Sequence, residues 1–303
     1  MIPREMEETA RSGQKAVLIM GATASGKSAL AMEIAEKFNG EILSADSMQF
    51  YRGLDIGTAK PGMEERKRIR HHLLDILDIH EKSDIYRFCI LAEAALKDIR
   101  KRGKLPIIAG GSGLYIHALL YGLDPLPAKQ ELRNELDRKY DNDEDFPLLL
   151  EIMRKSCPLD YERWNKHRRK LIRAYEVFLL CGSQISELQH RKTDEKPRSD
   201  IRSFYLHRER PVLLRRIEAR TETMLENGWI EETRALLAQG LLQTPTAWQA
   251  LGYALIAEYL NGKYSRAELK EKIVIATRQF ARRQDTWFRN RHPEALLIPL
   301  QQE

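Results

Sequence analysis

Residues 17–28 predict a buried strand, a glycine-bounded loop and the start of a helix, and they constrain the fold more than any other stretch. Gly21, Gly26, Lys27 and Ser28 fill the G-x-x-x-x-G-K-[ST] pattern of a phosphate-binding loop. In such a loop the glycines let backbone N–H groups converge on one anion, and the following helix adds the positive end of its dipole. Lys27 supplies a mobile positive charge, and Ser28 supplies a hydroxyl for a magnesium ion. The stretch therefore predicts a polyphosphate site, with a chance glycine turn as the alternative.

Three further apolar runs predict strands at 41–45, 105–109 and 203–206, and the pattern at 85–101 predicts a helix. The run at 105–109 opens into glycines and then a helix, as the first one does. Both loops are therefore expected at the same end of a parallel sheet, where ligands bind. Asp46 directly follows the strand at 41–45 and is expected there too. Its carboxylate suits a magnesium-bound water, a hydrogen bond from a nucleophile or a helix N-cap, and position alone does not decide between them.

The character of the chain changes between residues 126 and 197, where helical patterns and heavy charge occur without a convincing strand. The 303 residues are enough for two domains of roughly 150 residues each, and the hydrophobic fraction of 43% supports real cores. We therefore predict an α/β core formed by 14–125 and 198–303, with a helical insertion at 126–197. Residues 1–13 are polar and are expected to fray, and the chain after the last predicted strand is expected to be helical.

Several features argue against other classes of protein. No stretch is long and apolar enough to span a bilayer, and the N-terminus has no apolar secretory segment, so we expect a cytoplasmic protein without a membrane partner. Cys89, Cys157 and Cys181 form no zinc pattern and indicate a reducing compartment, and each is expected to be a buried small hydrophobe. His71 and His72 are adjacent, so they point in different directions and do not suit a shared metal.

The net charge of +6 is compatible with a nucleic-acid partner, and much of the positive charge lies in one basic run. The run comprises Arg163, Lys166, Arg168, Arg169, Lys170 and Arg173. On a helix most of these residues share one side, while Leu171, Tyr175 and Phe178 pack on the other. A solvated helix face is the simpler interpretation. The excess of one sign, without nearby acidic partners, favours contacts with backbone phosphates.

A second basic helix is predicted near the C-terminus. Arg278 and Arg282 are one turn apart and share a face, and guanidinium groups bind phosphate oxygens bidentately. The alternative is an ordinary surface helix with Phe280, Trp287 and Phe288 in the core.

Several motifs, in order along nearly the whole chain, resemble those of the tRNA dimethylallyltransferase (tRNA isopentenyltransferase) family, of the bacterial type. They are GATASGKS at 21–28, DSMQ at 46–49, DIGTAKP at 55–61, HHLLD at 71–75, GGSGLY at 110–115, RAYEV at 173–177, GY at 252–253 and TRQ…RQ…TW at 277–287. The resemblance implies a nucleotide-kinase-like parallel α/β core with an inserted helical domain. It also implies transfer of the dimethylallyl group from dimethylallyl diphosphate to N6 of the adenine at position 37, beside the anticodon of tRNA, with release of diphosphate and a need for Mg²⁺.

The same resemblance implies roles for individual residues. Asp46 would be the base acting on the adenine amine, with Lys27 and Ser28 acting on the leaving group and Ser28 as metal ligand. The diphosphate would be bound by Gly21, Ala22, Thr23, Ala24, Ser25, Gly26, Lys27 and Ser28. The tRNA would contact Asp46, Ser47, Met48, Gln49, Ser112, Arg133, Arg169, Lys170, Leu171, Ile172 and Arg173. The basic C-terminal helix further predicts that Arg278 or Arg282 approaches the diphosphate from the opposite side, and we expect a monomer.

Two other functions fit parts of the sequence. A small-molecule or nucleoside kinase would use the same nucleotide-binding loop to hold ATP and would need a hydroxyl acceptor. A non-catalytic RNA-binding protein would keep the loop as a relic. The basic insertion fits an RNA partner better than it fits a kinase.

Overall fold

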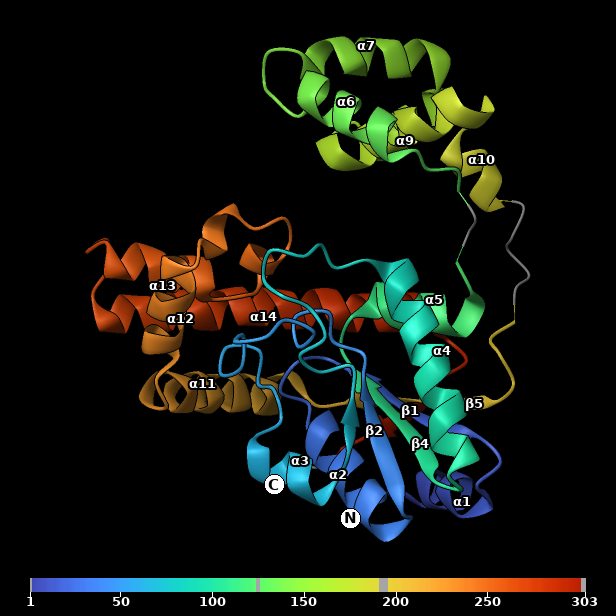
Figure 1. Cartoon of the computed structure of the whole chain (residues 1–303), viewed down its shortest axis with the longest axis vertical. Helices are drawn as coiled ribbons and strands as arrows, with labels where there is room; N and C mark the ends of the chain where they lie inside the picture. The colour runs from blue at the N-terminus through green and yellow to red at the C-terminus, as the bar shows by residue number, and fades with distance from the viewer. Residues whose placement is uncertain (1, 124–125, 191–195, 301–303) are drawn as a thin grey trace. The chain divides into compact units, whose positions relative to one another are not determined.

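The computed structural model describes residues 2–123, 126–190 and 196–300 (Figure 1). The chain packs into two compact units. The larger unit comprises Met1–Gly122 and Arg198–Glu303, and the smaller unit comprises Leu123–Pro197. Each unit has apolar clusters of its own.

A six-stranded sheet forms the centre of the larger unit, with the strands in the order β3-β2-β4-β1-β5-β6. The strands are β1 (Ala16–Gly21), β2 (Gly40–Ser44), β3 (His71–His72), β4 (Leu105–Gly110), β5 (Ile201–His207) and β6 (Leu296–Pro299). All neighbouring strands are parallel. The α/β class with a parallel sheet is therefore confirmed. The phosphate loop leaves the carboxyl end of β1, which lies inside the sheet and is buried throughout.

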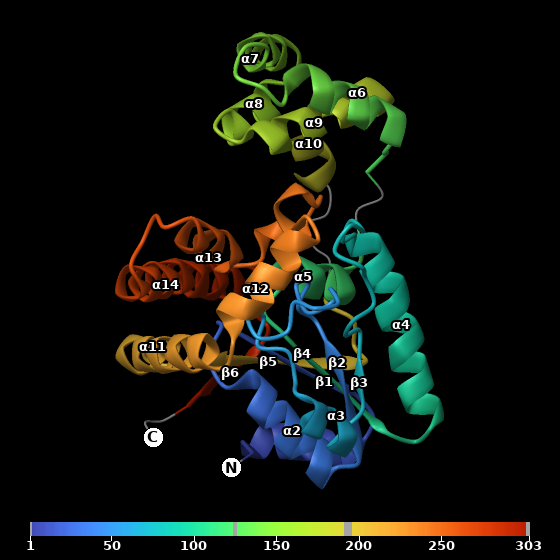
Figure 2. The ribbon, with the colours of Figure 1, turned by 60° about the vertical axis from the view of Figure 1, so that its left-hand side comes forward.

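Helices cover both faces of this sheet. The helices of the larger unit are α1 (Arg4–Ser12), α2 (Lys27–Lys37), α3 (Met63–Arg68), α4 (Ile85–Lys101), α5 (Gly113–Tyr121), α11 (Arg210–Glu226), α12 (Trp229–Ala238), α13 (Tyr253–Leu260) and α14 (Arg266–Arg291). Val17 and Ile19 of β1 join an apolar cluster with α1 and α2, whereas Leu18 and Met20 join another with α4 and α5. Figure 2 shows α2 and α4 on opposite sides of the strands. Because both faces are covered, β1 is apolar without alternation.

The predicted helix at 85–101 is confirmed as α4. A capping box formed by Ser265 and Glu268 starts α14. Two other predictions are wrong. Residues 4–12 form α1 instead of fraying, because Met6 is fully buried beside the sheet. The chain after β5 is not wholly helical, since β6 pairs with β5 at the sheet edge. Its four residues are too short for a periodicity signal.

The smaller unit is helical in its described residues. Its helices are α6 (Gln130–Tyr140), α7 (Phe146–Ser156), α8 (Pro158–Trp164), α9 (Arg168–Cys181) and α10 (Ile185–His190). Leu171 of α9 lies in the core of this unit, with Tyr175 and Phe178 packed against it, as the helical spacing predicts. Cys157 is buried in the same core, but Cys181 at the end of α9 is exposed, which corrects the expectation that all three cysteines are buried.

Candidate active site

The phosphate loop curls between β1 and α2 and lines a cavity of about 540 Å³. Gly26 precedes α2 with φ of 102°, a conformation in which a side chain would be strained. Lys27 lines the cavity, and its ammonium donates to the carbonyl of Ala22 at 2.7 Å. Burial, and then the nearby Arg220 guanidinium, lower the pKa of Lys27 to about 8. A lowered lysine pKa means that positive charge is poorly compensated, so an anion in this cavity would be stabilised.

Two arginines of α11 complete the positive lining of this cavity. Arg220 donates from Nη2 to the hydroxyl of Thr23 at 2.5 Å, and Arg216 donates from Nε to the carbonyl of Ala24 at 3.0 Å. Burial lowers the pKa of Arg220, as it does that of Lys27. Neither arginine is among the residues predicted from the sequence to bind the diphosphate. Their four-residue spacing is the signal in the sequence that indicates a shared helix face.

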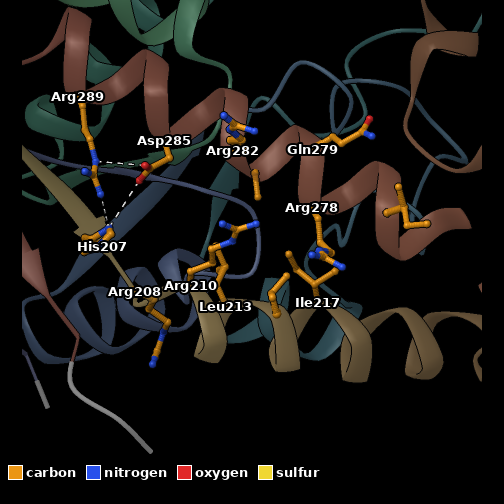
Figure 3. Close-up of a pocket in the computed structure, with 13 residues that line it drawn as sticks. His207, Arg208, Arg210, Leu213, Ile217, Arg278, Gln279, Arg282, Asp285 and Arg289 are labelled. Carbon is orange, nitrogen blue, oxygen red and sulfur yellow. Dashed lines mark hydrogen bonds and ion pairs between the residues drawn. The ribbon is translucent and has the colours of Figure 1, made fainter. Parts of the chain in front are cut away.

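Arg278 and Arg282 lie elsewhere, which corrects the prediction that one of them reaches the diphosphate. Both line a groove between α11 and α14 that also includes Arg210 (Figure 3). Arg216 and Arg220, instead of Arg278 or Arg282, line the cavity beside the phosphate loop. Spacing within α14 predicts that Arg278 and Arg282 share a face, but it carries no information about the neighbour that this face meets.

Asp46 follows β2 and lies at the carboxyl edge of the sheet. Its Oδ1 accepts a hydrogen bond from the N–H of Met48 at 3.0 Å, so the carboxylate caps the turn that follows β2. Burial raises the pKa of Asp46, while the Met48 N–H and the Lys27 charge oppose that rise. Asp46 therefore caps a turn and also lines the phosphate-loop cavity. A capping role and a role in catalysis are compatible for this carboxylate.

A second cavity of about 580 Å³ adjoins the first. Its apolar and aromatic lining includes Tyr115, Met224, Trp229, Leu251, Phe280 and Trp287. Thr23, Asp46, Thr58, Gly111 and Arg220 line both cavities. The anionic and apolar parts of a substrate can therefore meet beside the Asp46 carboxylate. Phe280 and Trp287 line this space, so only Phe288 of the three aromatic residues of α14 lies in the core.

Hydrogen bonds tie the turn after β2 to its surroundings. The N–H of Ser47 donates to the hydroxyl of Ser112 at 3.0 Å, and both residues line the apolar cavity with Met48. Gln49 lines the phosphate-loop cavity, and its Nε2 donates to the carbonyls of Thr58 and Ala59, each at 3.2 Å. The amide of Gln49 therefore holds a neighbouring loop. The side chains of Ser47, Met48 and Ser112 surround the space next to Asp46.

Gln284 of α14 links the two glycine loops. Its Oε1 accepts the N–H of Thr23 at 2.8 Å, and its Nε2 donates to the carbonyl of Gly111 at 2.9 Å. The side chain is buried, so both bonds form away from bulk water. One amide thereby fixes the phosphate loop against the loop that follows β4, a role that is not predicted from the sequence.

This arrangement agrees with comparisons to known proteins. The family model described as IPP transferase matches residues 49–291. The tRNA dimethylallyltransferase of Methylococcus capsulatus is 43% identical to this chain over 276 residues, which cover 90% of this chain and 88% of the relative. The chain belongs to the IPP transferase family.

Further tRNA-modifying enzymes are similar to this chain over most of its length. The tRNA dimethylallyltransferase of Geobacter metallireducens is 43% identical over 277 residues, covering 90% of this chain and 89% of the relative. The crystal structure of the full-length tRNA isopentenylpyrophosphate transferase of Bacillus halodurans has a TM-score of 0.67 at 34% identity, covering 94% and 90% of the two chains. A eukaryotic dimethylallyltransferase acting on tRNA has a TM-score of 0.81 at 27% identity, covering 94% and 74%.

In the smaller unit of this IPP transferase family member, two of the predicted tRNA-binding arginines are engaged internally. The carboxylate of Glu176 is fully buried and pairs with Arg133 at 2.8 Å and with Arg173 at 2.7 Å. Arg173 also donates to the carbonyl of Pro127 at 2.9 Å. These contacts correct the premise that the basic run lacks acidic partners. The acidic partners of the basic run either lie on the inward face of α9, as Glu176 does, or are distant in the sequence.

The other predicted tRNA-binding residues of α9 are either buried or exposed. Leu171 and Ile172 are buried, so the prediction that their side chains contact tRNA is wrong. Lys170 is exposed, and the side chain of Arg169 is 70% exposed with Asp141 at 3.7 Å. Arg169 and Lys170 are therefore the exposed members of the predicted tRNA-binding set on α9.

Among residues 2–123, 126–190 and 196–300, no helix is long and apolar enough to cross a bilayer. Over the same residues, no group of three or more His, Cys, Asp or Glu side chains is arranged to hold a metal. His72 pairs with the buried carboxylate of Glu41 at 2.7 Å, and Nδ1 of His71 contacts the carbonyl of Ile69 at 2.8 Å.

Proposed function

We propose that this IPP transferase family member transfers the dimethylallyl group of dimethylallyl diphosphate to N6 of the adenine at position 37 in tRNA. The observation that carries the proposal is the Asp46 carboxylate where an anion cavity adjoins an apolar cavity. The new C–N bond forms at N6, the allylic C–O bond breaks, diphosphate leaves and the N6 proton passes to Asp46. A base is needed because the adenine amine is a weak nucleophile whose lone pair is delocalised into the ring.

The leaving diphosphate is held by the phosphate loop. Backbone N–H groups at the start of α2, Lys27 and Arg220 face the same cavity. Fixed positive groups stabilise the charge that grows on the leaving group as the C–O bond breaks. Poor compensation of Lys27 before substrate binds is consistent with this role. Arg220 and Arg216 replace the C-terminal arginines as the second side of the clamp.

The residues also fit the Mg²⁺ that a diphosphate substrate requires. Mg²⁺ keeps several waters and takes few protein ligands, with substrate phosphates completing its shell. Ser28 lines the cavity at the exposed start of α2 and would be the protein ligand. When bound, the ion would neutralise charge on the diphosphate.

The apolar cavity suits the other two reacting groups. The prenyl chain would lie against Met224 and Trp229, and the adenine would leave the anticodon loop to reach Asp46. Ser47, Met48 and Ser112 line the same cavity and would contact the tRNA around the reacting base. Arg169 and Lys170 would contact tRNA phosphates from the helical unit.

One assay tests this proposal against the alternatives. Unmodified tRNA is incubated with labelled dimethylallyl diphosphate or with ATP labelled on its terminal phosphate. We expect label from the diphosphate ester on tRNA, with N6-dimethylallyladenosine in the nuclease digest. Label passing only from ATP to a small hydroxyl acceptor would identify a kinase instead, and tRNA binding without any transfer would identify a binding protein.

A further inference from the structure

A groove between α11 and α14 lies outside the site described above. Its volume is about 600 Å³, and α11 and α14 run side by side along it (Figures 1 and 3). Leu213, Ile217 and Ile275 form its apolar part, and Arg210, Arg278 and Arg282 bring guanidinium groups to it. The groove and the phosphate-loop cavity have no lining residue in common in the described chain.

Charge in this groove is unbalanced. Asp285 is its only acidic lining residue in the described part of the chain, and it is already engaged by Arg289 at 3.2 Å and by His207 at 3.6 Å. Arg210, Arg278 and Arg282 have no ion pair among the described residues. Three guanidinium groups around one cavity repel one another, and an anion bound between them would remove that repulsion. Figure 3 shows Arg278 of α14 extending towards the helix that carries Arg210.

We propose that this groove, the α11–α14 groove, binds an organic diphosphate ester at a site separate from the substrate diphosphate. A phosphate monoester carries about −1.5 to −2 charges at pH 7, so a diphosphate ester approaches the charge of three arginines. The apolar part of the ligand, a base or a prenyl chain, lies on Leu213, Ile217 and Ile275. An RNA phosphodiester concentrates only one charge at each phosphate and leaves this apolar surface without a partner. The groove therefore fits a small amphipathic polyanion better than a nucleic-acid backbone.

One residue that lines the groove also contacts the backbone of the phosphate loop. Arg208 is buried, lines the groove and donates from Nε to the carbonyl of Ser25 at 2.8 Å. Arg208 therefore joins the floor of the groove to the loop backbone. The side chains of Arg216 and Arg220 face the other cavity, so the two binding sites lie on different faces of α11.

Calorimetric titration of the full chain tests the proposal without relying on the transfer reaction. The ligands are ADP, dimethylallyl diphosphate and inorganic diphosphate. The background variant Lys27→Ala/Arg220→Ala weakens the phosphate-loop site. We expect this background to retain one site for ADP or for dimethylallyl diphosphate. The two esters together distinguish a nucleotide from a prenyl ligand.

Adding Arg278→Gln and Arg282→Gln to the background should then weaken that site by about tenfold or more, because two charge-assisted contacts are lost. Arg215→Gln, an exposed arginine of α11 that does not line the groove, is the matched control and should leave the affinity unchanged. Ile275→Gln should weaken ester binding while leaving inorganic diphosphate binding unchanged.

Three outcomes would overturn the proposal. If the background variant binds neither ester, the groove is not a site. If inorganic diphosphate binds as tightly as both esters, the apolar surface takes no part. If the two glutamine changes leave ester binding intact and weaken tRNA binding, the groove is an RNA contact. Failure of the transfer assay alone would leave the groove result standing.

Discussion

At the scale of single residues, opposing effects act on the pKa of Asp46. Burial raises the pKa of its carboxyl group, whereas the Met48 N–H and the Lys27 charge stabilise the carboxylate. A carboxylate with a raised pKa is a stronger proton acceptor, which suits a base acting on a weakly acidic amine. The hydrogen bond to Met48 also fixes the direction of the side chain.

Asp46→Asn should therefore keep the fold and lose the reaction. Asparagine retains an oxygen for the Met48 N–H but cannot accept the N6 proton. We expect the single-turnover rate to fall by about a hundredfold or more, with the dissociation constant for tRNA unchanged. A rate close to that of the unmodified enzyme would assign Asp46 to capping alone.

The pH dependence of the rate gives an independent check. Only the ionised carboxylate accepts a proton, so the single-turnover rate should fall as the pH drops through the pKa of Asp46. Because burial raises that pKa above its ordinary value of 3.8, the fall should begin at a higher pH than an exposed aspartate would give. A rate that stays constant down to pH values near 3.8 would argue against this assignment.

Arg220 and Lys27 should affect the leaving group rather than tRNA binding. Arg220→Lys keeps the charge but loses the planar fork, so the single-turnover rate at saturating tRNA should drop. Lys27→Ala should cost about 2–4 kcal/mol of transition-state stabilisation, as for one preorganised donor. Arg215→Lys, on the same helix but outside the cavity, serves as control. Equal effects of the two α11 substitutions would remove Arg220 from the clamp.

At the scale of elements, α9 separates two kinds of basic residue. Arg173 faces inward to the buried Glu176 and stabilises the helical unit, while Arg169 and Lys170 face outward. Removing one partner of a buried pair leaves a charge without compensation, so changes at Arg173 report on stability rather than binding.

Arg169→Ala with Lys170→Ala should raise the KM for tRNA and flatten its dependence on salt, because fewer counterions are released on binding. The KM for dimethylallyl diphosphate should barely move. Arg154→Ala with Lys155→Ala removes the same charge from the exposed side of α7 and is the matched control. A rise in both KM values would show that the α9 pair acts through the structure of the unit.

At the scale of the whole molecule, Glu41 connects three parts of the larger unit. It lies on β2, is only 3% exposed, and pairs with Arg102 after α4 and with His72 of β3. Hydrogen bonds from Arg102 and then His72 outweigh burial and lower the pKa of Glu41 to about 2. A carboxylate with a lowered pKa stabilises the folded state only while it remains ionised.

The stabilisation by Glu41 should accordingly be complete above pH 4.5, its ordinary pKa, and should be lost as the pH falls towards 2. Urea denaturation at several pH values should show a steeper acid loss for the unmodified protein than for Glu41→Gln. Glu64→Gln, whose side chain is 82% exposed, is the control and should follow the unmodified protein. Parallel curves for all three would assign the acid sensitivity to other groups.

The sequence by itself determines the features that arise from neighbouring residues. The strand, loop and helix around Lys27 form as predicted, because glycine positions and apolar runs act locally. The position of Asp46 at the sheet edge follows from the strand before it. The order of motifs indicates the family without any coordinates.

Only the tertiary structure decides which side chains meet. Arg220 and Thr23 are 197 positions apart, and Gln284 and Thr23 are 261 apart, yet both pairs are hydrogen bonded. Helical periodicity states which residues share a face, but the element packed against that face depends on the whole core. For that reason the sequence predicts Arg278 or Arg282 beside the diphosphate, whereas packing of α14 against α11 places both in a separate groove.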